Sequence, residues 1–267
     1  MAVKGLLGLA KAAKNYGNPP LPGAPMPANV PGAGLVNIGP NPAAEQAAIQ
    51  YSQSSGIPYT PVTSFMPADP QFGARVAREY ELMPHDPTNR RVLQSYGALA
   101  DEIAGQYKAM MRAGIKPEFN LNPYPQSPYL GLMDMLETGR LQVYPTRAGF
   151  GMDDAFDASQ NLLLAESPFK ISGQPATFND LFRAVHDFQG HAKVGAGFRG
   201  AGEEMAYFSH AGTMSPDGLK ALASETRGQN SWLNYGPFGD ANRTAGIDDT
   251  VFAEQKSGLL PNWAIQE

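Results

Sequence analysis

Between residues 86 and 114, apolar side chains return at every third or fourth position, the spacing of an amphipathic helix. Asp86 and Pro87 have the character of an N-cap and a first turn, and Gly114 marks an end. The apolar positions are Leu93, Tyr96, Leu99, Ala100, Ile103, Tyr107, Met110 and Met111. This pattern predicts the longest helix of the chain and one wall of its core.

Shorter elements are predicted around this helix. One helix is expected from Ser127-Pro128 to Gly139, and four more near 178–190, 202–211, 216–227 and 250–257. The segments 141–144 and 169–171 are short strand candidates, and the turn Ser172-Gly-Gln-Pro follows the second. The predicted fold class is mainly α (α+β), a helical body with a small sheet or hairpin.

Proline and glycine interrupt the helical pattern at the start of the chain. Residues 1–61 hold ten of the 24 prolines and eight of the 29 glycines. Such a composition favours extended, polyproline-like backbone. We predict an extended arm over 1–61, which begins with a short amphipathic helix, and a single mainly helical domain over 62–267. The arm is either a linker or a segment that becomes ordered on neighbouring subunits.

Charge separates the same two regions. Three lysines against one glutamate give the arm a net charge of +2, and 17 basic against 24 acidic residues give the remainder −7. The total of −5 carries no strong nucleic-acid signature. The sequence has no run of about 18 apolar residues, so it predicts no membrane span. Lys11 and Lys14 interrupt the apolar start, so we expect no export signal. The lack of cysteine excludes disulfides and thiolate chemistry.

Three of the four histidines, His186, His191 and His210, lie within 25 residues. Clustered histidines with nearby carboxylates are the material of a metal site or of a general acid/base pair. On an ideal α-helix, His186 and His191 lie about 140° apart, unlike the i, i+4 histidines of a His-Glu-x-x-His zinc site. Both reach one centre if the helix stops at Gly190. Otherwise they are a core-edge histidine and a histidine at a helix C-terminus.

Two consecutive glutamates on the next predicted helix are candidates to join these histidines, although such a pair is also typical of a solvated face. The candidate metal ligands are His186, His191 and Glu203, with zinc, iron, manganese and no metal all left open. The candidate catalytic residues are His186, Asp187, Glu204 and Glu225.

A string of polar, multidentate side chains surrounds a tryptophan between residues 224 and 235. Its amides and guanidinium could orient a polar ligand on which the indole stacks. The alternative is a helix C-terminus, with Gly228 in the left-handed conformation, whose polar side chains connect a loop. The candidate substrate-binding residues are Arg227, Gln229, Asn230 and Trp232.

Several blocks follow one another in a specific order. They are Met83-Pro-His-Asp-Pro, the segment 181–192 with His-Asp-Phe-Gln-Gly-His, Gly202-Glu-Glu, Glu225-Thr-Arg-Gly-Gln-Asn-Ser-Trp and Phe252-Ala-Glu-Gln-Lys-Ser-Gly-Leu-Leu-Pro. In this order they resemble an uncharacterised domain of tailed bacteriophages and prophages, found alone or in large polyvalent virion-associated proteins. The resemblance covers about 70–263 and implies that His85 joins the other polar residues in one constellation. Gln189 stands where other members have Phe.

The resemblance implies a virion-associated structural protein, such as a head, connector or internal component, that is made in the host cytoplasm. Its arm would contact neighbouring virion proteins in a symmetric assembly, and its body would carry the His/Glu site. The alternative is a metal-dependent or acid/base hydrolase carried in the virion, with Arg227, Gln229 and Asn230 orienting the substrate.

Overall fold

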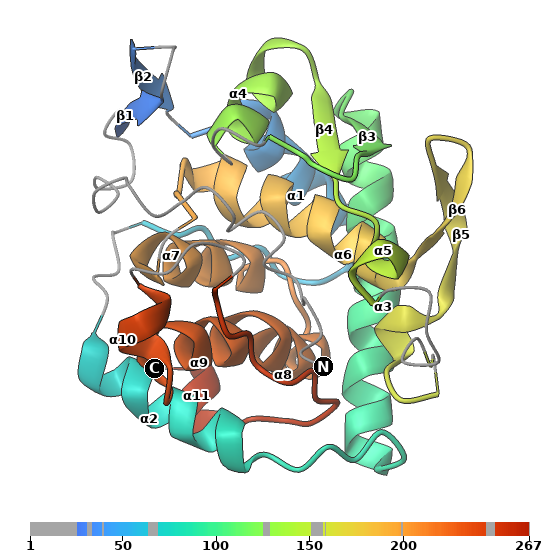
Figure 1. Ribbon diagram of the computed structural model, residues 1–267. Coiled ribbons are helices and arrows are strands. Elements are labelled where there is room, and N and C mark those ends of the chain that lie inside the picture. The colour runs from blue at the N-terminus through green and yellow to red at the C-terminus, as the bar shows by residue number, and fades with distance from the viewer. Residues whose placement is uncertain are drawn as a thin grey trace.

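The computed structural model of the protein describes residues 26–30, 34–38, 40–63, 69–124, 129–150, 157, 159–198, 200–243 and 249–266. The amphipathic helix expected at the start of the arm lies outside these residues. The described part is mainly helical with a small strand content, as predicted (Figure 1).

The helix α3 (Arg90–Arg112) is the axis of the core, and α1 (Pro42–Ser55), α6 (Phe178–Val185) and α8 (Pro216–Ala223) pack against it (Figure 1). It confirms the predicted long helix. Its first residue is Arg90 and not Pro87, because 87–88 form a turn and the Asn89 side chain caps the helix by accepting from the Arg91 amide. Gly114, at φ 90°, follows its last turn.

The second group of helices packs around α8 and α9 (Gln229–Tyr235). The helix α2 (Pro70–Leu82) packs along α9, and α7 (Gly200–Ala211) contacts both α8 and α9 (Figure 1). Shorter helices complete the described part: α4 (Tyr129–Glu137), α5 (Thr146–Phe150), the 3₁₀ turn Leu162–Leu164, α10 (Gly239–Asn242) and α11 (Asn262–Gln266).

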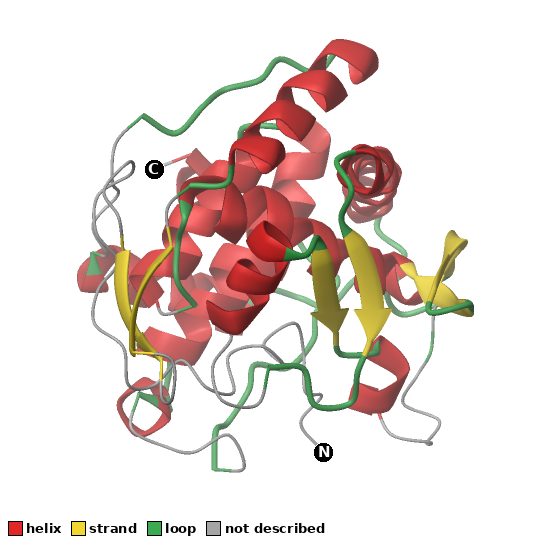
Figure 2. Cartoon of the chain, turned by 90° about the horizontal axis from the view of Figure 1, so that it is seen from above, coloured by secondary structure: helices red, strands yellow, loops and turns green. Residues whose placement is uncertain are grey.

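The described strands form separate two-stranded pieces (Figure 2). The hairpins are β1 (Met26–Val30) with β2 (Gly34–Ile38) and β5 (Glu166–Ile171) with β6 (Gln174–Thr177), while β3 (Lys116–Phe119) and β4 (Arg140–Val143) run parallel. Ser172 and Gly173 both have positive φ, as a two-residue hairpin turn of the twist-compatible type requires. Both strand candidates of the sequence are confirmed.

Two helices change to π-helical hydrogen bonding without a break. The helix α6 runs into a π-helix, η3 (His186–Ala192), and α8 runs through a second one, η4 (Ser224–Gly228), into α9. The helix predicted near 178–190 therefore does not stop at Gly190. Gly228, which one of the two alternatives for this segment placed in the left-handed conformation, has a φ of −61°. Gly228 instead permits close packing, since a Cβ there would lie 2.6 Å from the Tyr80 ring of α2.

The boundary of the extended arm at residue 61 is wrong for residues 42–55, which form α1. Ala44, Ala47 and Tyr51 are at most 4% exposed and belong to the core. Asn41 caps this helix by accepting from the amides of Ala43 and Ala44. Alanine-rich sequence and a good cap outweigh the surrounding prolines here.

The helix expected at 250–257 is not formed. Side chains satisfy the backbone of this segment instead: the Tyr80 hydroxyl donates to the Glu254 carbonyl, the Tyr96 hydroxyl lies 3.2 Å from the Lys256 carbonyl, and the Val251 amide donates to Asn242. These bonds compete with helical ones. Among the described helices, none has both the length and the apolar character needed to cross a membrane.

Candidate metal centre

Three side chains converge where η3 faces α7. One nitrogen each from His186 and His191 and one oxygen from Glu203 lie within 4.8 Å of one another. The His191 Nε2 to Glu203 Oε2 distance is 3.4 Å and the His186 Nε2 to Glu203 Oε2 distance is 3.9 Å. Ligands at about 2.0–2.1 Å from a tetrahedral zinc ion lie roughly 3.4 Å apart, so a small closure of His186 completes the set. These residues could hold a metal ion.

The π-helix explains why residues five apart meet. In a π turn the hydrogen bond runs from residue i to residue i+5, so these two residues follow each other on one face. Gly190 lies within this turn, and a Cβ there would be 3.1 Å from both the Ala206 carbonyl of α7 and the His186 ring. The i, i+5 pair thus does in η3 what an i, i+4 pair does in an α-helix.

Both histidine rings are held through their second nitrogen. Nδ1 of His191 lies 3.3 Å from the Ala196 carbonyl, and its ring stacks on Phe198 at 4.2 Å. Nδ1 of His186 lies 3.2 Å from Nδ1 of His210. In protein metal sites, such partners orient the imidazole and fix the nitrogen that binds.

Burial and charge oppose each other within the cluster. Burial would raise the pKa of Glu203, but His191 and His186 outweigh it and lower that pKa to about 2. Burial would lower the pKa of His191, but Glu203 outweighs it and raises it. For His186, burial prevails and lowers the pKa. The two histidines therefore differ: His191 holds its proton more tightly beside the ionised Glu203, whereas His186 gives up its proton more readily.

Asp187 lies beside this centre and is 5% exposed. Burial raises the pKa of Asp187 to about 7. The charge of Glu203 also raises this pKa, whereas His191 and Arg183 lower it. Its carboxylate makes no hydrogen bond within the part of the chain that the structure describes. A carboxylate in this position is available for proton transfer.

Glu204 and Arg227 lie together, apart from the three candidate ligands. Nε of Arg227 donates to Glu204 at 3.0 Å, Nη2 also binds Glu204, and Nη1 donates to the Ala264 carbonyl at 2.8 Å. The guanidinium is fully buried among aromatic rings within 5 Å, those of Phe72, Tyr207 and Phe208. The structure places these two residues in a helix-bridging ion pair and not at a free binding surface.

Glu225 and Gln229 belong to a third cluster. The buried Glu225 carboxylate accepts from the Tyr96 hydroxyl at 2.6 Å and from amides of Gln255, Gln229 and Asn161 at 2.7, 3.0 and 3.5 Å. Despite these bonds, burial raises its pKa. The sequence proposed a catalytic Glu225, but its oxygens are occupied by neighbouring donors.

The remaining candidates lie elsewhere. The Trp232 indole donates to Glu81 of α2, and the Asn230 amide donates to the Gly200 carbonyl at 3.5 Å. His85 accepts from the Ser257 amide at 2.9 Å and lies 3.2 Å from Gln160. The single constellation implied by the resemblance is thus divided among several sites in the described residues.

Sequence reasoning missed Gln106. Its side chain is completely buried and contacts His210 at 2.8 Å. One signal was available, because Gln106 falls on the apolar stripe of α3 that includes Leu99, Ile103 and Met110. A polar residue in such a stripe requires a buried partner.

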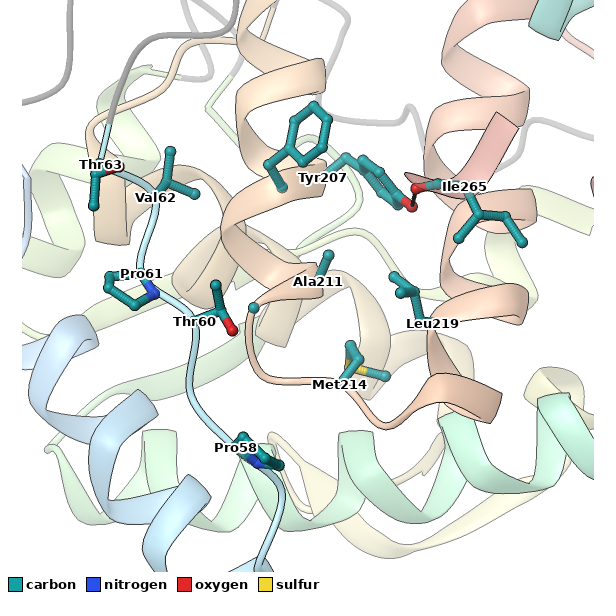
Figure 3. Close-up of a pocket in the computed structure, with 12 residues that line it drawn as sticks. Pro58, Thr60, Pro61, Val62, Thr63, Tyr207, Ala211, Met214, Leu219 and Ile265 are labelled. Atoms are coloured by element: carbon teal, nitrogen blue, oxygen red, sulfur yellow. Dashed lines mark hydrogen bonds between the residues drawn. The ribbon is translucent and has the colours of Figure 1, made fainter. Parts of the chain in front are cut away.

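A separate apolar pocket of about 400 Å³ lies between 58–63 and the helices α7 and α8 (Figure 3). Ala211, Met214 and Leu219 line it, and the Tyr207 hydroxyl donates to the Ile265 carbonyl at its edge (Figure 3). Glu203 and His210 of α7 contact η3 instead. The pocket is therefore not part of the metal centre.

Comparison with family models, with curated proteins and with solved structures finds no match for this chain.

Proposed function

We propose that the protein is a divalent-metal-dependent hydrolase whose metal ligands are His186, His191 and Glu203. The observation that carries the proposal is the convergence of their ligand atoms within 4.8 Å. The hydrogen bonds on the second nitrogen of both histidines support it, because they leave the two Nε2 atoms directed at Glu203.

The donor set favours zinc. Two histidines and one glutamate are a ligand set of catalytic zinc sites, in which a fourth position stays open for water or substrate. Iron(II) and manganese(II) accept the same donors and are the alternatives. A bound zinc ion would lower the pKa of its water to about 7 and polarise the substrate. Asp187, which is buried beside the ligands and has a raised pKa, is the candidate for moving the proton.

Elemental analysis of the purified full-length protein tests this function. We expect about one zinc per chain, and its loss in His191→Gln. His85→Gln is the matched control, because it replaces a histidine outside the cluster. Iron or manganese at the same stoichiometry would change the metal but keep the site. A metal-free protein that also fails to bind added zinc, iron and manganese would contradict the proposal.

We also propose that the protein is carried in the virion of a tailed bacteriophage, which the resemblance of its sequence blocks supports. Hydrolase and virion component are compatible roles, since a particle can carry an enzyme as a structural part or as cargo. The N-terminal segment is then the candidate contact with neighbouring virion proteins. Mass spectrometry of purified particles tests this location, and particles without the protein would contradict it.

A further inference from the structure

A buried chain of hydrogen bonds leads from α3 through α7 to the metal centre. The Gln106 amide nitrogen lies 3.3 Å from the Thr213 carbonyl and 3.1 Å from the Thr213 hydroxyl. The Gln106 amide oxygen lies 2.8 Å from Nε2 of His210, and Nδ1 of His210 lies 3.2 Å from Nδ1 of His186. Gln106, His210 and Thr213 are fully buried, so water does not compete for these bonds.

The Thr213 end fixes the direction of this chain. A backbone carbonyl only accepts, and the Thr213 hydroxyl already donates to the His210 carbonyl at 2.8 Å. Gln106 must therefore direct its NH₂ group to Thr213 and its oxygen to His210. An exchanged amide would place two acceptors against each other at 3.3 Å.

The orientation of Gln106 then determines which nitrogen of each histidine ring carries the hydrogen. Because the Gln106 oxygen accepts, Nε2 of His210 carries the hydrogen, and Nδ1 of a neutral His210 is an acceptor. Nδ1 of His186 must supply the hydrogen between the two rings. Nε2 of His186 is then unprotonated, and it faces the Glu203 carboxylate at 3.9 Å with no proton between them.

We propose that Gln106 and His210 are positioning residues of the metal centre: they hold His186 in the tautomer whose Nε2 lone pair can bind a cation. The role as part of a metal centre rests on the proposed function, whereas the tautomer itself does not. This relay, the hydrogen-bond chain from Thr213 through Gln106 and His210 to His186, leaves Nε2 of His186 facing the Glu203 carboxylate, and both are acceptors. A divalent cation between them would satisfy both. It also explains the polar side chain of Gln106 on the apolar face of α3.

The tautomer is tested on full-length, metal-free protein with ¹⁵N-labelled histidine, by two-bond ¹H–¹⁵N correlation NMR at neutral pH. We expect His186 to carry its hydrogen on Nδ1 and His210 on Nε2. Gln106→Leu should abolish this preference in His210. Wild-type spectra with the hydrogen of His186 on Nε2 would overturn the relay, whatever the protein does with metal.

Zinc affinity tests the consequence. We expect Gln106→Leu and His210→Leu to bind Zn²⁺ about 10–100-fold more weakly, the usual effect of removing a partner behind a metal ligand. Tyr207→Phe is the matched control, because it removes a buried hydrogen bond of the same helix that lies outside the relay. It should keep wild-type affinity.

The outcomes separate a positioning role from a structural one. Loss of stability with unchanged zinc affinity in Gln106→Leu would assign the relay to folding alone and overturn the proposal. If His210→Leu does not fold, Gln106→Leu and the wild-type spectrum still decide. A wild-type protein that binds no zinc would contradict the proposed function, whereas the NMR result would stand as the test of the tautomer.

Discussion

Glu203 and Glu204 are neighbours on α7, yet their carboxylates belong to different networks. Glu203 lies 3.4 Å from His191, and Glu204 binds the guanidinium of the buried Arg227. Consecutive residues of an α-helix point about 100° apart, so α7 presents one carboxylate to η3 and the other to η4. Glu203 is therefore the metal-ligand candidate, and Glu204 stabilises the fold.

Exchange of each glutamate for glutamine should separate these two roles. We expect Glu203→Gln to lose zinc, because a neutral amide is a poor ligand. Glu204→Gln should keep zinc, and its unfolding free energy should fall by about 3–5 kcal/mol, because the buried guanidinium of Arg227 loses its anion. Elemental analysis and urea unfolding of both variants measure this.

Each variant is the control for the other. The assignment is wrong if Glu204→Gln loses zinc while its unfolding free energy stays at the wild-type value. It is equally wrong if Glu203→Gln retains one zinc per chain.

Arg227 provides a second prediction. Lysine keeps the positive charge, but it lacks the fork that binds Glu204 twice and the planar group that contacts three aromatic rings. We expect Arg227→Lys to lower the unfolding free energy by about 2 kcal/mol, since the lost hydrogen bonds are buried and charged. Zinc content should not change.

The sequence also suggested a substrate-binding role for Arg227, and the same variant examines it. A protein with wild-type stability in urea and impaired binding of a substrate would favour that role. The expected loss of stability, with a normal metal content, would instead confirm the bridging ion pair as its main contribution.

Local sequence signals predicted much of the fold. The helical period of α3 and the turn at Ser172-Gly173 depend on residues close together in the sequence, and both elements are present in the structure. The segment at 250–257 shows the limit, because its backbone bonds to Tyr80 and Tyr96, which are more than 150 residues away. No local pattern reports such partners.

The candidate site was predicted in its ligands and not in its geometry. Clustered histidines and an acidic helix indicated His186, His191 and Glu203. The i, i+5 spacing argued against a shared face, because it was measured on an ideal α-helix. In the structure a π turn places the two histidines on one face, and Gly190 of this turn packs against α7. Such packing is a tertiary effect that the local sequence does not show.

Glu225 gives a prediction about pH. Burial raises its pKa above the ordinary 4.5, and the nearest titratable groups, Tyr96 and Tyr80, also have raised pKa values from burial and stay neutral. The folded protein therefore binds this proton more tightly than the unfolded chain. The resulting stabilisation is complete below about pH 4.5 and is lost as the pH rises through the folded pKa.

Urea unfolding of metal-free wild type and Glu225→Gln between pH 4.5 and 8 measures this effect. We expect the unfolding free energy of wild type, relative to that of the variant, to fall with rising pH. Glu254→Gln, at an exposed position of the neighbouring segment, should give a flat difference. A flat difference for Glu225→Gln as well would contradict the prediction.

The N-terminal boundary gives the last prediction. Because α1 belongs to the core, removal of 1–39 and removal of 1–61 should differ sharply, although an arm that ended at 61 would make them equivalent. Tyr51 alone is 4% exposed, and burying a side chain of that size contributes about 1.5–3 kcal/mol. Its ring packs so closely that a Cβ on Gly105 of α3 would lie 2.7 Å away.

We expect the chain without 1–39 to unfold cooperatively in urea and to keep its zinc. The chain without 1–61 should lose cooperative unfolding, because it exposes the face of α3 that α1 covers, and Asn41 no longer donates to the Ala192 carbonyl at the end of η3. That bond connects α1 to the metal centre, so zinc should be lost together with the fold. Two truncated proteins of equal stability would place α1 outside the folding unit and restore the longer arm.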